Sequence, residues 1–259
     1  MDKNELYALQ ELASVGNLDA MNQLIDYYLE NKQFSLAFLI AERFEYFSFP
    51  SGYRRLAFFH QKGIGTENNI SKAIKYYELG FQKGDIPSGY NLSLIYIQSQ
   101  EAYKALYYLS VGVENNHIPS IRLLSELYFK GEGVIKNLDI SINLLEKAIE
   151  LGDKKSYDKI AKIYFSKQDY LSSFDYFLKG SEYNDLDAIY HVGLSYAKGL
   201  GVKQDFSLAF KYYERGANLF EPRCLYNLSL YYRNGIATNQ NISLADKLEA
   251  QAYEKGFKK

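Results

Sequence analysis

The sequence contains seven copies of one pattern, and this periodicity constrains the possible fold more than any other feature. In each copy an aromatic residue or His follows an apolar residue by four positions, giving the anchors Tyr28, His60, Tyr96, Tyr128, Tyr164, Tyr196 and Tyr232. The distance between successive anchors alternates between 32 and 36 residues. A period of about 20 to 50 residues is typical of solenoids, in which each unit buries its apolar face against its neighbours.

A second set of positions keeps the same register and is occupied mostly by small residues. Its members are Ala37, Ala73, Ala105, Ser141, Ser173, Ala209 and Ala245, and the positions seven residues later hold Phe44, Gly80, Gly112, Ala148, Gly180, Gly216 and Ala252. Small residues two turns apart on one helix face allow a neighbouring helix to approach closely. We therefore predict that they form helix–helix contacts.

Each copy is predicted to be a pair of helices, with the anchor on the first (helix A) and the small residues on the second (helix B). Residues 119–130 and 138–151 illustrate the two, and all four prolines (Pro50, Pro87, Pro119 and Pro222) stand where a helix A begins. The units anchored at His60, Tyr128, Tyr196 and Tyr232 carry the inserts GIGTENN, GEGVIKN, GLGVKQD and GIATNQN, in which Gly ends a helix and Asn or Asp caps the next.

No β-type alternation or interdomain linker interrupts this pattern. The sequence therefore predicts one all-α repeat domain over residues 1–259, a right-handed α-solenoid (superhelix) of about seven antiparallel helix pairs. We expect residues 1–17 to form an N-terminal capping helix and residues 18–257 to form the seven repeats.

The segments VGLSYAKGLGVKQDFSLA and LLSELYFKGEGVIKNLDIS carry the pattern most fully. They resemble the Sel-one-like repeat (SLR), a family related to the tetratricopeptide repeat. The sequence departs from the family pattern at His60, which replaces the anchor Tyr, and in three units that lack the Gly-x-Gly loop. The resemblance implies a curved protein whose helices A line a concave face that binds another protein or a peptide.

The resemblance also indicates which residues that face exposes: those six and two positions before each anchor, and those just after it. The residues predicted to bind a partner are Arg54, Phe58, Tyr90, Leu94, Arg122, Glu126, Phe129, Asp158, Lys162, Phe165, Tyr190, Leu194, Tyr226 and Leu230, and the first repeat adds Asn22 and Asp26 by the same rule. Apolar side chains beside charged ones suit a protein ligand, because apolar contacts supply affinity and charges fix register. Packing of Tyr90, Tyr190 and Tyr226 against the next helix A is an open alternative, and the anchors themselves are expected to be buried.

Other classes of site find little support. The 30 basic and 31 acidic residues give a net charge of −1, which argues against nucleic-acid binding. The single Cys224 excludes a disulfide framework and a cysteine-based zinc site, and three scattered His residues make no convincing metal site. The Gly-x-Gly loops follow no strand and contain no GKS or GKT, so they do not indicate a phosphate site. We expect no catalytic residue, metal or cofactor.

No apolar run reaches the length of about 18 residues that a transmembrane helix needs, and acidic residues replace the basic end of a signal peptide. These features predict a cytoplasmic protein without membrane insertion, while delivery into a host cell stays open.

Three functions follow in order of preference. The first is a non-catalytic protein–protein interaction adaptor or scaffold that binds a peptide or protein on its concave helix-A face. The alternative, implied by the resemblance, is a bacterial host-interaction (effector-type) protein or a toxin-neutralising immunity protein, and an enzyme is the least favoured. The sequence leaves open weak self-association through the last repeat.

Overall fold

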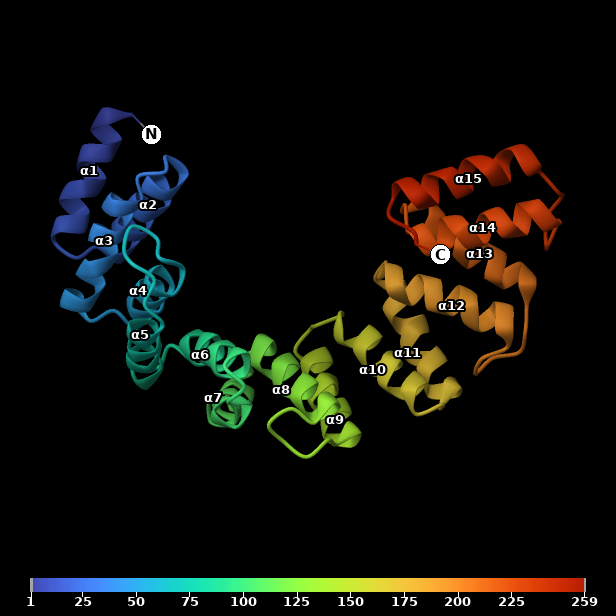
Figure 1. Cartoon of the computed structure of the whole chain (residues 1–259), viewed down its shortest axis with the longest axis horizontal. Coiled ribbons are helices and arrows are strands. Elements are labelled where there is room, and N and C mark those ends of the chain that lie inside the picture. The colour runs from blue at the N-terminus through green and yellow to red at the C-terminus, as the bar shows by residue number, and fades with distance from the viewer. Residues whose placement is uncertain (1, 259) are drawn as a thin grey trace. The chain divides into compact units, whose positions relative to one another are not determined.

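The structure, a computed structural model, describes residues 2–258, which form fifteen α-helices and no strand (Figure 1). The helices are α1 (Lys3–Ser14), α2 (Leu18–Glu30), α3 (Phe34–Phe47), α4 (Pro50–Lys62), α5 (Ile70–Gln82), α6 (Ile86–Gln98), α7 (Ala102–Glu114), α8 (Ile118–Lys130), α9 (Leu138–Glu150), α10 (Ser156–Ser166), α11 (Tyr170–Glu182), α12 (Leu186–Lys198), α13 (Phe206–Asn218), α14 (Pro222–Asn234) and α15 (Ile242–Glu254). The predicted all-α repeat fold is confirmed. The even-numbered helices carry the anchors and are the helices A, and the odd-numbered helices from α3 onward are the helices B.

The chain divides into two compact units, Met1–Lys136 with helices α1–α8 and Asn137–Lys259 with helices α9–α15. Within each unit, every helix packs against the helix that follows it in the chain. Each of the four prolines occupies the first or second position of a helix A, where its missing N–H leaves no helical hydrogen bond unmade. The predicted Asn and Asp caps are also present, with Asn69 and Asp205 each accepting a hydrogen bond from a first-turn amide at 2.9 Å.

The small residues of helix B contact the first turn of the next helix A. A Cβ atom added to Gly80 would lie 2.5 Å from Oγ of Ser88, and one added to Gly112 would collide with Ser120. Real Cβ atoms do not come this close to their neighbours, so these positions require glycine. The predicted helix–helix contacts are confirmed at these positions.

In one contact of this kind the large residue lies on helix B and the glycine on helix A. Phe44 occupies the position that holds Gly or Ala in the other copies, and it is fully buried. Its partner is Gly52, where a Cβ atom would lie 2.5 Å from Cβ and Cγ of Phe44. A large residue on α3 is therefore accommodated by the absence of a side chain on α4.

The Gly-x-Gly loops do more than end a helix. Gly199 ends α12 in the left-handed conformation with a φ of 71°, as predicted. The second glycine, Gly201, lies so close to the backbone of Tyr170, in the first turn of α11, that a Cβ atom would collide with its carbonyl oxygen. The corresponding glycines Gly65 and Gly133 press against the first turns of α3 and α7 in the same way. Each of these three Gly-x-Gly loops therefore packs on the helix B of the preceding copy.

The expectation that all anchors are buried is wrong for five of the seven. Tyr28 and His60 are buried, whereas Tyr96, Tyr128, Tyr164, Tyr196 and Tyr232 are half-buried. The ring of Tyr96, for example, stacks on that of Tyr108 in helix B with centroids 6.1 Å apart. Stacking covers one face of the ring and leaves its edge and hydroxyl near solvent, which is a common arrangement for Tyr.

Candidate protein-binding surface

All fourteen residues predicted to bind a partner lie on helices A, and none of them is buried. The first unit holds Arg54 and Phe58 on α4, Tyr90 and Leu94 on α6, and Arg122, Glu126 and Phe129 on α8; the second holds Asp158, Lys162 and Phe165 on α10, Tyr190 and Leu194 on α12, and Tyr226 and Leu230 on α14. Most of the pairs are four residues apart, which places both side chains on one helix face. We call the solvent-facing side chains of the helices A the helix-A surface, and describe it for each unit separately.

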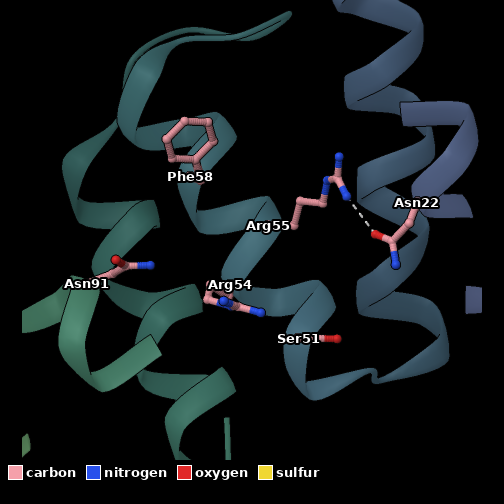
Figure 2. Close-up of a pocket in the computed structure, with 6 residues that line it drawn as sticks. All are labelled: Asn22, Ser51, Arg54, Arg55, Phe58 and Asn91. Atoms are coloured by element: carbon pink, nitrogen blue, oxygen red, sulfur yellow. Dashed lines mark hydrogen bonds between the residues drawn. The ribbon is translucent and has the colours of Figure 1, made fainter. Parts of the chain in front are cut away.

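In the first unit this surface contains a cavity of about 450 Å³ (Figure 2). Its lining comes from three helices A and consists of Asn22 on α2, Ser51, Arg54, Arg55 and Phe58 on α4, and Asn91 on α6. Ser51, Arg55 and Asn91 were not among the predicted residues. Arg55 and Asn91 both stand five residues before their anchors, so a wider helical stripe would have included them.

The two arginines of the cavity differ in what they contact. Arg55 donates a hydrogen bond to Oδ1 of Asn22 at 2.8 Å and forms an ion pair with Asp26. Arg54 pairs through Nε with Asp85, at 3.1 Å. Neither Nη of Arg54 donates a hydrogen bond within the part of the chain that the structure describes. Arg54 therefore presents hydrogen-bond donors to the cavity, while Arg55 already has its partners.

Two further predicted residues of the first unit, Tyr90 and Glu126, contact other side chains of that unit. The ring of Tyr90 meets that of His117 edge to face, with centroids 5.7 Å apart. Burial, and then the cation of Arg54, lowers the pKa of His117, so this imidazole is neutral near pH 7. Glu126 forms an ion pair with Lys130 at 2.6 Å, one helical turn away.

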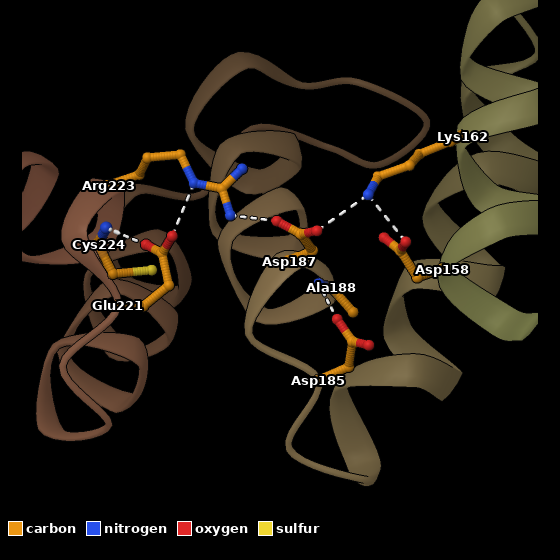
Figure 3. A network of polar contacts seen from close by, with 8 residues as sticks. All are labelled: Asp158, Lys162, Asp185, Asp187, Ala188, Glu221, Arg223 and Cys224. Carbon is orange, nitrogen blue, oxygen red and sulfur yellow. Dashed lines mark hydrogen bonds and ion pairs between the residues drawn. The ribbon is translucent and has the colours of Figure 1, made fainter. Parts of the chain in front are cut away.

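In the second unit the helix-A surface carries a network of ion pairs (Figure 3). Nζ of Lys162 lies 2.8 Å from Asp158 and 2.9 Å from Asp187. Arg223 continues the network by pairing with Asp187 and with Glu221, the latter at 2.7 Å. Each cation of this network pairs with two carboxylates, whereas Arg54 of the first unit pairs with one, through its Nε.

Two carboxylates of the network have shifted pKa values of opposite sign. Burial raises the pKa of Asp158, against the effect of the hydrogen bond from Lys162. One of its oxygens, Oδ1, is buried without a hydrogen-bond partner among residues 2–258. Burial also acts on Asp187, but hydrogen bonds from Lys162 and Arg223 outweigh it and lower the pKa of that group.

The three tyrosines whose accessibility was left open are all half-buried. Tyr90 contacts His117 directly before α8, and Tyr190 lies under the guanidinium of Arg223 on α14, 4.3 Å from the ring centroid. These two contacts agree with the alternative of packing toward the next helix A. Tyr226 instead stacks on Phe257, with centroids 4.3 Å apart, so a residue beyond α15 covers part of it.

The His and Cys residues occupy packed positions. His191 stacks on Phe177 with centroids 4.4 Å apart, and burial, followed by the cations of Arg223 and Lys162, lowers its pKa to about 4. The Cys224 thiol is fully buried, and burial raises its pKa. Within residues 2–258, no group of three His, Cys, Asp or Glu side chains could hold a metal ion. Over the same range, every helix is too short or too polar to cross a membrane.

Comparison with known proteins gives a match to the Sel1 repeat over residues 50–85, 118–153, 186–219 and 222–257, just over half of the chain. These four segments contain the four anchors that precede a long loop, from His60 to Tyr232. No curated protein sequence matches the chain significantly.

Three solved structures illustrate the likeness in fold. A protective antigen of uropathogenic Escherichia coli with an SLR fold aligns at 21% identity and a TM-score of 0.72, covering 96% of this chain and 58% of the antigen. A Sel1 repeat protein from Oxalobacter formigenes aligns at 22% identity and a TM-score of 0.68, covering 94% of this chain and 100% of that one. The C-terminal part of a TPR repeat-containing protein from Cytophaga hutchinsonii aligns at 18% identity and a TM-score of 0.60, covering 90% and 95%. The chain thus spans a little over half the length of the E. coli antigen.

Proposed function

Because the chain belongs to the Sel1 repeat family, whose members generally mediate protein–protein interactions, we propose that it binds a segment of another protein on its helix-A surface. The repeat fold is typically non-catalytic, so the proposed role is that of an adaptor or scaffold. The family resemblance predicted from the sequence is confirmed.

The observation that carries this proposal is the cavity of the first unit. Phe58, which lines this cavity, is 42% exposed. One helical turn earlier on α4, Arg54 presents Nη groups that donate no hydrogen bond to any described residue. An exposed aromatic ring supplies affinity through apolar contact, and directional donors fix the position of the ligand. An exposed aromatic ring and solvent-facing Nη donors contribute little to the stability of the folded chain, so their combination supports a binding role.

The proposal is tested by affinity capture from the native cell, followed by quantitative mass spectrometry. The bait is the wild-type chain or the variant Phe58→Ser/Leu94→Ser, which removes two exposed apolar groups from the helix-A surface. The matched control is Tyr103→Ser/Tyr107→Ser, which removes two exposed aromatic groups from helix B α7 of the same unit.

We expect the proteins enriched by the wild type to be lost with the helix-A variant and retained with the helix-B variant. Equal capture by the wild type and the helix-A variant would contradict the proposal. The identity of the captured protein separates a general adaptor from the host-directed and toxin-neutralising roles predicted from the sequence.

A further inference from the structure

We propose that the cavity between α2, α4 and α6 binds the side-chain carboxylate of an Asp or Glu residue within an extended segment of the partner, with Arg54 as its main contact. The inference rests on the proposed function and specifies the chemistry of the partner at this cavity.

The first argument is the way in which Arg54 is held. Its Nε pairs with Asp85, whose carboxylate is only 9% exposed. Asp85 is itself fixed as the cap of α6, accepting hydrogen bonds from the amide of Ser88 at 3.0 Å and from its hydroxyl at 2.6 Å. A guanidinium anchored at Nε keeps its two Nη groups as a planar pair of donors. This geometry matches the two oxygens of a carboxylate.

The second argument is the composition of the cavity. Its lining consists of two Arg, two Asn, one Ser and one Phe, and none of these described residues is acidic. Each arginine pairs with one carboxylate from outside this lining, Arg54 with Asp85 and Arg55 with Asp26. The two Nη groups of Arg54 remain without an acceptor among the described residues, so the cavity keeps donors that a carboxylate from outside can accept.

The third argument concerns the source of the carboxylate, which we infer to be a side chain within the partner's segment and not the C-terminus of the partner. Figure 2 shows Asn91 on one side of Arg54 and Ser51 and Asn22 on the other. The side chains of Asn91 and Ser51 form no hydrogen bond with any described residue. A chain that continues past Arg54 in both directions can use the polar groups on both sides, whereas a C-terminal carboxylate would use those on one side only.

The span of the cavity sets the length of the segment. Neighbouring packed helices lie roughly 10 Å apart, so three helices A span roughly 20 Å. An extended chain covers this distance in about six residues. Phe58, one turn after Arg54 on α4, then favours an apolar residue of the partner close to the acidic one.

The test uses pools of fluorescein-labelled octapeptides, blocked at both ends and randomised except for a central Glu, Gln or Lys. Binding to the full chain is measured by fluorescence anisotropy. We expect the Glu pool to bind roughly tenfold more tightly than the Gln pool, because hydrogen bonds between charged groups exceed neutral ones by about that factor. A fourth pool, with a central Gln and a free C-terminal carboxylate, should bind no better than the blocked Gln pool.

Two variants assign the preference to the cavity. Arg54→Gln should bring binding of the Glu pool down to that of the Gln pool, while Lys104→Gln, the same change of charge at an exposed site on α7, should leave it unchanged. Because Arg54→Gln also removes the pairing with Asp85, Asn91→Asp serves as a second variant. It leaves that pairing intact, places a carboxylate in the cavity and should weaken the Glu pool selectively.

Equal binding of the Glu and Gln pools, tighter binding of the Lys pool, or tight binding of the free-carboxylate pool would each overturn the inference. So would a preference for Glu that both cavity variants retain. If capture depends on Phe58 and Leu94 but the pools are not distinguished, the proposed function stands and this inference fails. If the Glu preference is found but capture does not depend on Phe58 and Leu94, the proposed function fails instead.

Discussion

The reversed contact between Phe44 and Gly52 makes a quantitative prediction about stability. In Gly52→Ala the new Cβ atom would lie 2.5 Å from Cβ and Cγ of Phe44, about 1 Å inside an ordinary contact of 3.5 to 4.0 Å. Cβ of Phe44 moves only with the backbone of α3, so rotation of the side chain cannot relieve the overlap. Overpacking of this kind costs about 1–3 kcal/mol, and replacing Gly by Ala in a helix returns about 1 kcal/mol. Because rotation of the side chain cannot relieve the overlap, we take the upper part of that range, about 2–3 kcal/mol, and expect the variant to lose about 1–2 kcal/mol of unfolding free energy.

A double-mutant cycle isolates the contact. Phe44→Gly/Gly52→Ala reproduces the pairing of Gly180 with Ala188 at the α11–α12 contact, where a Cβ atom added to Gly180 would lie 3.0 Å from Cβ of Ala188. In the Phe44→Gly background there is room for the methyl group, so Gly52→Ala should raise stability by about 1 kcal/mol through helix propensity. The coupling between the two sites is then about 2–3 kcal/mol.

Urea denaturation followed by circular dichroism measures all four proteins, with free energies from linear extrapolation. The reasoning is refuted if Gly52→Ala is as stable as the wild type, or if the coupling is below about 0.5 kcal/mol. Either result would mean that α3 and α4 can separate without loss and that the close approach is not a constraint.

Three further outcomes are expected. Lys162→Met should lower the unfolding free energy by about 1 kcal/mol near pH 7, a small value because the side chain is 45% exposed. Lys162 opposes the effect of burial on Asp158, so its loss should raise the pKa of Asp158 further, and the deficit should shrink as the pH falls from 7 toward the raised pKa of the wild type; a constant deficit in urea titrations across that range would contradict this. Gly201→Ala should lower the unfolding free energy by about 3 kcal/mol or more, because of its φ of 71° and the collision of the new Cβ atom with a carbonyl oxygen. Gly152→Ala, with a φ of 97° and no neighbour within 4 Å, should lower it by about 1 kcal/mol. Equal losses of thermal stability would show that loop packing does not matter. Cys224 should not react with a thiol reagent in the native protein at about pH 8 and should react fully in urea, because burial raises its pKa; rapid native labelling would contradict its placement.

The sequence was sufficient for features that depend on neighbours at fixed spacing. Gly112 could be assigned to a helix contact because each copy holds a small residue there, and Pro119 could be placed at a helix start because a helix interior does not tolerate it. Asn69 could be predicted as a cap because it stands between a glycine-rich loop and an apolar helix. These features recur at equivalent positions of several copies, so a position that is ambiguous in one copy can be assigned from the others.

The cavity depended on partners that the repeat does not specify. Arg54 and Arg55 are adjacent in sequence and both line it, yet Asp26 engages only the second and Asp85 only the first. Asp26 lies 29 residues before Arg55, and nothing in the spacing indicates which arginine it reaches. The repeat therefore predicts the face on which a side chain lies, whereas the choice of ion pair depends on the individual residues of each copy.

The burial of the anchors could not be predicted for a related reason. An aromatic residue at a repeated position indicates packing, but it does not show whether the opposite helix covers the ring or stacks beside it. His60 is buried and stacks on Tyr76, whereas Tyr164 stacks on Tyr176 in the same way and stays half-buried. Phe38 also packs against His60, but the equivalent Phe174 packs against Tyr196, which is half-buried, so these contacts do not predict burial.

The packing of each Gly-x-Gly loop on the helix B of the preceding copy has a consequence for how such a chain can change length. Gly65, Gly133 and Gly201 recur every 68 residues, and each one joins a short copy to the long copy that follows it. Removing any one of the first six copies would leave a loop without its supporting helix or a helix without its loop. Duplication and deletion, whether in evolution or in design, should therefore preserve the packing only when they proceed in blocks of two copies.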